Sequence, residues 1–249
     1  MIWNTYRRAK KQPANISTID WRAVPDDMLQ KMVETGYMPH KGIPKKVFAM
    51  GPWQPEHLEP LTKKYMPEGS TLQFLFQGSK ELEDNIKLIS TELEKIGVHG
   101  AYKAFKMLRP HSYRSDMYRL MNLWYQGGIY LDAKFGFDMP VEKWIDFDND
   151  QLAYCPDRLS TVNCAPLVMT QYHPLAALGV KTIIDRVENR TYYTDPWKLT
   201  GPGLYRDLGN GTGMITQYNA RCWLKYLAKM DEYSLVGGED ITKHDDHYA

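Results

Sequence analysis

Short apolar runs alternate with amphipathic segments along the first half of the chain. IPKKVFAM (43–50) and TLQFLFQG (71–78) have the length and apolar content of buried strands. The segment 79–97 repeats apolar residues at helical spacing beneath a charged outer face: Leu82, Ile86, Ile89 and Leu93. Strands that alternate with helical crossovers predict an α/β fold, with a mainly parallel sheet flanked by helices and ligands at the carboxyl ends of its strands.

The polar and aromatic residues 1–40 predict an N-terminal extension packed on the main domain. Its one clear helix covers 25–37, where early acids suit a helix start and Gly36 suits an end. Residues 41–249 contain no linker or internal repeat and predict a single domain.

Composition removes several classes of function. The 31 basic and 30 acidic residues give a net charge of +1, so we expect neither a nucleic acid nor an anionic membrane as partner. The chain has no apolar run of the ~20 residues that a membrane span needs, and its basic N-terminus lacks the apolar core of a signal peptide. A cytoplasmic protein is the expectation.

The segment 111–137 carries the chemistry. Its first part has the apolar periodicity of a helix, which Ser112 would cap and the pair Gly127 and Gly128 would end. Asp116 and Arg119, three residues apart, would lie side by side on that helix. Such a spacing is also typical of a surface ion pair.

The run IYLDAKF (129–135) follows at once and predicts a buried strand. A carboxylate at its end, Asp132, is costly to bury unless it meets a ligand, a metal or a fixed donor. Because side chains alternate along a strand, Asp132 and Lys134 should point to the same side, toward the cleft.

The stretch SYRSDMYRLMNLWYQGGIYLDAKF resembles the signature of the glycosyltransferases with a DXD sugar-binding motif. These include yeast initiating mannosyltransferases and bacterial capsule and lipopolysaccharide transferases, and the clostridial glucosylating toxins share their core. Further stretches resemble the same family in order along the chain: IPKKVF, NCAPLVMTQYHPL and LTGPGLYRDL.

The resemblance implies a GT-A fold, a UDP- or GDP-sugar donor, a hydroxyl acceptor on a glycan or polysaccharide, and transfer with retention of the anomeric configuration. It implies catalytic roles for one set of residues: Asp116, Arg119, Asp132, Lys134 and Asn163. It implies donor-binding roles for a second set: Phe48, Ala49, Met50, Trp53, Tyr130 and Gly201.

Lys134 departs from the family pattern. The last carboxylate of the motif holds a divalent cation, usually Mn²⁺, against the donor diphosphate, and here a lysine takes its place. Three interpretations stay open. The ammonium neutralises the leaving diphosphate directly, the domain has lost catalysis and only binds a nucleotide-sugar or glycan, or a metal stays on Asp132 with help from the C-terminal His247.

Overall fold

The computed structural model describes residues 19–137, 139–156, 162–191, 193, 196–212 and 224–226. The α-helices are α1 (Asp26–Thr35), α2 (Leu58–Tyr65), α3 (Lys80–Lys95), α4 (Ala101–Met107), α5 (His111–Gln126), α6 (Pro174–Glu188) and α7 (Pro202–Thr212). The strands are β1 (Lys46–Gly51), β2 (Thr71–Phe76), β3 (Gly128–Tyr130), β4 (Phe135–Phe137), β5 (Leu152–Pro156), β6 (Val162–Met169) and β7 (Leu224–Tyr226). Short 3₁₀ helices cover Trp21–Ala23, Val141–Lys143 and Pro196–Lys198.

The main sheet has the strand order β2-β1-β3-β6-β5. Strand β1 pairs in parallel with β2 and with β3, whereas β6 is antiparallel to both of its neighbours. Four strands therefore share one direction and β6 opposes them. This arrangement, with helices on both faces, confirms the predicted α/β fold class with a mainly parallel sheet.

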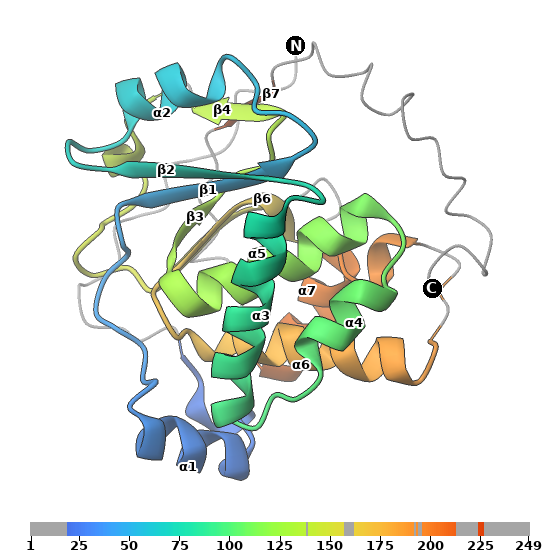
Figure 1. Cartoon of the computed structure of the whole chain (residues 1–249). Helices are drawn as coiled ribbons and strands as arrows, with labels where there is room; N and C mark the ends of the chain where they lie inside the picture. Colours follow the sequence, from blue (N-terminus) through green and yellow to red (C-terminus); the bar gives the residue numbers. More distant parts are fainter. Residues whose placement is uncertain are drawn as a thin grey trace.

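Alternate strand residues separate two hydrophobic cores, one on each face of the sheet. Phe48 and Met50 of β1 point into the larger core with the apolar sides of α1 and α3 to α7. Val47 and Ala49 point into the smaller core, where α2 and the residues after β4 cover the sheet. Figure 1 shows these two layers, with α2 and the β4–β7 pair on one side and the larger helices on the other.

The described part of the N-terminal segment packs against the larger core through α1. Met28 and Met32 are buried there, and the helix lies beside α3. Gly36 ends α1 in a left-handed conformation, as the sequence predicts. Among the described residues, no helix is both long and apolar enough to cross a membrane.

The glycine pair between α5 and β3 allows two close approaches. Gly127 has a φ of 64° and Gly128 a φ of 104°, both in the region that favours glycine. A Cβ at Gly127 would lie 2.5 Å from the Gln171 amide nitrogen, and one at Gly128 would lie 2.6 Å from the Lys46 carbonyl oxygen. The pair therefore ends the helix, as predicted, and also lets β3 enter the sheet.

Two local predictions need correction. Ser112 is not the helix cap, because α5 begins at His111 after an extended Pro110 and has no side-chain cap. The run 129–135 is not one strand: β3 ends at Tyr130, and a turn separates it from β4. Ile129 and Tyr130 are in register with β1 and the Leu131 amide still bonds to it, so the chain leaves the sheet just before Asp132.

Candidate active site

Helix α5 and the turn after β3 bring together the charged residues that the sequence singles out. Asp116 and Arg119 lie one turn apart on α5, and Arg119 Nη1 is 3.0 Å from Asp116 Oδ1, without hydrogen-bond alignment. Arg119 Nη2 donates to Asp132 Oδ1 at 2.9 Å. One guanidinium therefore joins two carboxylates that are 16 residues apart.

Arg119 is almost fully buried, which sets this network apart from a surface ion pair. Its side chain is 2% exposed, and its guanidinium carbon lies 4.5 Å from the centre of the Tyr130 ring. A buried cation needs opposite charge and hydrogen bonds to offset its lost hydration. The two carboxylates and the aromatic face supply that compensation and hold the guanidinium in one place.

Asp116 is held from a third element, the segment before α7. The hydroxyl of Thr200 donates to Asp116 Oδ2 at 2.9 Å, and Thr200 is fully buried. Burial raises the pKa of the Asp116 carboxyl, while the Arg119 charge and the Thr200 hydrogen bond act in the opposite direction. A Cβ at Gly201 would come within 3.4 Å of Asp116 Oδ2, so the backbone lies close to this carboxylate.

Lys134 is the more exposed cation of the cluster. Its ammonium lies 3.8 Å from Asp132 Oδ2, with the lysine side chain 45% exposed and the aspartate side chain 25% exposed. The two side chains share one side, as predicted, although a turn rather than a strand places them there. The amide of Phe135 closes that turn on the Asp132 carbonyl at 2.9 Å.

The residues predicted to contact the donor do not all lie together. Phe48 and Met50 face one core and Ala49 faces the other, because neighbouring residues of β1 alternate. Tyr130 is 1% exposed beneath Arg119, whereas Trp53, in the loop after β1, is 46% exposed. Of these five side chains, Trp53 is therefore the one that presents a large surface to solvent.

Asn163 lies near the start of β6. Because β6 runs against β3, with Leu167 beside Tyr130, its first residues extend past the carboxyl end of β3, toward the side where Asp132 lies. The side chain of Asn163 and the whole of His247 lie outside the described residues.

The geometry adds two residues that the sequence does not single out. Thr200 contacts Asp116, and His57 contacts the turn that carries Lys134, with its Nε2 atom 3.1 Å from the Ala133 carbonyl oxygen. Thr200 stands in the stretch LTGPG, whose likeness to the family was the one available signal. Nothing in the local sequence marks His57.

A small cavity of about 130 Å³ opens at the carboxyl ends of β1 and β2. Met50, Gln77 and His111 line it together with residues of α3 and α4. Gln77 also donates to Ser115, the neighbour of Asp116, at 3.4 Å. The cavity is therefore next to the helix that carries the charged cluster.

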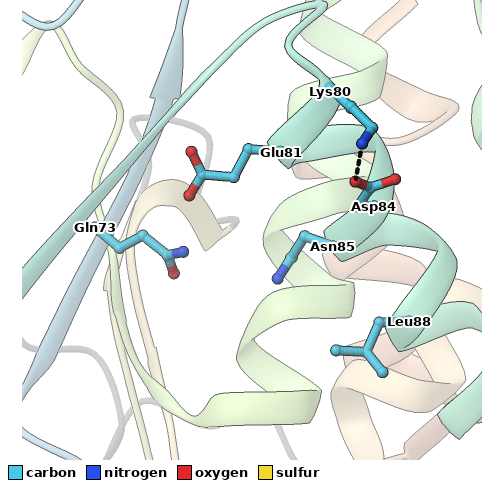
Figure 2. A pocket seen from close by; sticks show the side chains of 6 residues that line it. All are labelled: Gln73, Lys80, Glu81, Asp84, Asn85 and Leu88. Carbon is cyan, nitrogen blue, oxygen red and sulfur yellow. Dashed lines mark ion pairs between the residues drawn. The ribbon is translucent and has the colours of Figure 1, made fainter.

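A larger hollow of about 510 Å³ lies between β2 and α3, and Figure 2 shows its lining. Four of its six lining side chains are exposed: Lys80, Glu81, Asp84 and Leu88. No charged residue of the candidate site reaches it. We regard it as a solvated surface depression, because an open wall of mobile charged side chains gives no enclosure to a ligand.

The described residues around Asp132 do not fit a divalent cation. The two carboxylates of the cluster, Asp132 and Asp116, are already joined by Arg119. Lys134 adds a second positive charge 3.8 Å from Asp132. Within the described part of the chain, no group of three or more His, Cys, Asp and Glu residues could hold a metal ion.

A family of known proteins is similar in sequence to the part of the chain that carries the charged cluster. The family described as "Glycosyltransferase sugar-binding region containing DXD motif" matches residues 61–150, which include α3, α5 and the turn after β3. The match confirms the predicted resemblance to the DXD glycosyltransferases and supports glycosyl transfer in general. No curated protein sequence matches the chain. Among solved structures, "PaToxG Glycosyltransferase" is similar with 15% identity and a TM-score of 0.47, over 73% of this chain and 74% of that one.

Proposed function

We propose that this protein transfers a sugar from a nucleotide-sugar to an acceptor hydroxyl of a glycan or polysaccharide, with retention of the anomeric configuration. The observation that carries the proposal is the charged cluster at the carboxyl end of β3. There a buried arginine fixes two carboxylates while a half-exposed lysine stands beside one of them. Carboxylates suit sugar hydroxyls, and a nearby ammonium suits a diphosphate.

Different residues around this cluster would bind the sugar and the base of the donor. Asp132 is 25% exposed and would accept hydrogen bonds from sugar or ribose hydroxyls. Trp53, exposed in the loop after β1, would lie against the base. The cavity beside Met50 and His111 leaves room at the same end of the sheet for part of the nucleoside.

Lys134 would stabilise the leaving group. As the bond between the anomeric carbon and the diphosphate oxygen breaks, negative charge grows on that oxygen, and an ammonium within reach lowers the energy of the transition state. Arg119 is 2% exposed and joins the two carboxylates. Its role in the proposal is to orient Asp116 and Asp132, and the contact with the phosphate falls to Lys134.

The acceptor hydroxyl would attack from the face that the diphosphate leaves. Its oxygen bonds to the anomeric carbon, and its proton passes to the departing diphosphate oxygen, so no separate protein base is required. This front-face course follows from the resemblance to retaining enzymes of the family. The proposed reaction uses no metal at Asp132, because the described residues around Asp132 do not fit a divalent cation.

The second candidate is a nucleotide-sugar or glycan binding module without catalysis. The observation in its favour is Lys134, which replaces a carboxylate of the family motif. A binding module and an enzyme share the need for Asp132 and Arg119. They differ only in whether the bond to the diphosphate breaks.

One set of incubations separates the two candidates. The protein is first screened by thermal shift against UDP-, GDP- and dTDP-sugars, because a ligand at 100 times its dissociation constant adds about 2.7 kcal/mol of stability. The donor that stabilises it is then incubated in radiolabelled form with EDTA and, separately, with Mn²⁺. Release or transfer of the sugar in EDTA supports the enzyme that uses Lys134, and binding without release under both conditions supports the module.

A further inference from the structure

The turn that carries Lys134 leaves the main sheet before it reaches the charged cluster. The amide of Leu131 donates to the Phe48 carbonyl at 2.8 Å, and the next residues depart from β1. Phe135 closes the turn on Asp132 and begins β4. The position of Lys134 therefore depends on what holds a short irregular segment between two strands.

His57, in the loop between β1 and α2, bonds to the backbone of this segment. Its Nε2 atom lies 3.1 Å from the carbonyl oxygen of Ala133 and 3.3 Å from that of Phe135. A carbonyl oxygen can only accept a hydrogen bond, so the Nε2 atom must carry the proton. The two carbonyl oxygens share this N–H as acceptors. These are the carbonyls of the residues directly before and after Lys134.

The loop that carries His57 lies against the same turn. It connects β1 to α2 and also carries Trp53. A Cβ at Gly51, where this loop begins, would lie 3.7 Å from the Ala133 Cβ and 3.4 Å from the Trp53 carbonyl oxygen. The loop that carries Trp53 therefore lies against the turn of Lys134 at two points, Gly51 and His57.

We propose that His57 is a positioning residue for Lys134. By donating to the carbonyls on both sides of the lysine, its imidazole fixes the backbone from which a long, half-exposed side chain must reach the diphosphate. A fixed backbone leaves only the side-chain torsions to order when the donor binds, which lowers the entropic cost of the productive geometry. The link to turnover rests on the proposed function, whereas the hold on the turn does not.

The first experiment measures the turn itself and needs no activity. Hydrogen exchange of residues 131–137 is followed by mass spectrometry in the wild type, His57→Leu and His57→Gln, with the exposed His99→Leu as matched control. We expect faster exchange in the leucine variant, near wild-type exchange in the glutamine variant, whose amide can still donate, and no change in the control. Unchanged exchange in His57→Leu would overturn the proposal. If that variant does not fold, His57→Ser, too short to reach the carbonyls, takes its place with the same expectation.

The second experiment is a double-mutant cycle with Lys134→Ala, using the donor identified above. We expect His57→Leu to lower kcat about tenfold with little change in KM, as loss of one shared hydrogen bond permits. The double variant should be no slower than Lys134→Ala alone, since His57 acts through Lys134. If the losses in kcat of the two single variants simply add in the double variant, His57 does not act through Lys134. If the wild type turns over no nucleotide-sugar, the proposed function fails, and the exchange experiment still decides whether His57 holds the turn.

Discussion

Two helices of equal length present oppositely charged pairs at one-turn spacing, with different surroundings. On α3, Lys80 and Asp84 lie 3.8 Å apart with side chains 91% and 57% exposed, and Figure 2 shows this pair at the rim of the open hollow. On α5, Arg119 and Asp116 lie 3.0 Å apart with side chains 2% and 15% exposed. The sequence spacing alone hardly distinguishes them.

The difference lies in what each pair would leave behind if it were broken. An exposed pair loses little, because water replaces the missing partner, and such pairs contribute about 0–1 kcal/mol. Removal of one member of a buried network leaves an uncompensated charge in the interior. The pair on α3 is therefore expected to be dispensable, whereas breaking the network on α5 should destabilise the protein.

The largest expected effect comes from Arg119→Met. It leaves Asp116 and Asp132 without their shared cation, so the free energy of unfolding should fall by about 3–5 kcal/mol, measured by urea denaturation. The matched change on α3, Lys80→Met, should stay within about 0.5 kcal/mol of the wild type. Equal losses in the two variants would contradict the comparison.

Lys134→Ala tests whether the exposed end of the network serves chemistry rather than stability. We expect kcat with the identified donor to fall about ten- to hundredfold, because the charge on the leaving diphosphate loses its stabilising cation. The free energy of unfolding should change by less than about 1 kcal/mol, since the side chain is 45% exposed. A variant with wild-type kcat would remove Lys134 from the reaction.

Thr200→Val examines the link between Asp116 and the segment before α7. The substitution keeps the shape of the side chain and removes the 2.9 Å hydrogen bond, so the free energy of unfolding should fall by about 1–2 kcal/mol. Thr200→Ser keeps the hydroxyl and should recover most of that loss. If serine is no better than valine in urea titrations, the hydroxyl contributes nothing at this position.

His173 provides a pH dependence of the free energy of unfolding rather than a loss at one pH. Its Nδ1 atom accepts from the Leu175 amide at 3.2 Å and caps α6, and burial lowers its pKa to about 3. In the unfolded chain the pKa is about 6.5, so below that pH the unfolded state takes up a proton that the folded state refuses. The free energy of unfolding should therefore fall as the pH drops from about 6.5 toward 3, by at most about 1.4 kcal/mol per unit.

His173→Asn keeps an acceptor for the cap but does not titrate. Urea titrations at pH 7, 6 and 5 should show a shallower decline in this variant than in the wild type. If the free energy of unfolding declines equally in both proteins, groups other than His173 cause the pH dependence.

The sequence predicts the parts of this protein that depend on local pattern. Residues close together in the chain determine each of these parts. They are strands β1 and β2, the apolar side of α3, and the end of α5 at the glycine pair. The sequence also predicts that Asp116 pairs with Arg119, because one helical turn separates them.

The parts that the sequence could not predict depend on distant contacts. The run 129–135 looks like a single strand because most of its residues are apolar, yet β3 ends at Tyr130 and the chain turns away while β1 continues to Gly51. Thr200 reaches Asp116 across 84 residues, and His57 reaches Ala133 across 76. Such contacts produce no repeating pattern in the sequence, because each one involves a single residue from each of two distant segments.

The glycine pair before β3 carries a lesson for distant sequence comparisons. Any larger residue at Gly127 or Gly128 would collide with backbone atoms of neighbouring segments, whatever reaction the protein catalyses or ligand it binds. A lineage under selection for architecture alone would therefore retain both glycines while Lys134 drifted. The same two glycines in a remote homologue would therefore indicate a shared architecture, and only the charged residues on either side of them could indicate shared chemistry.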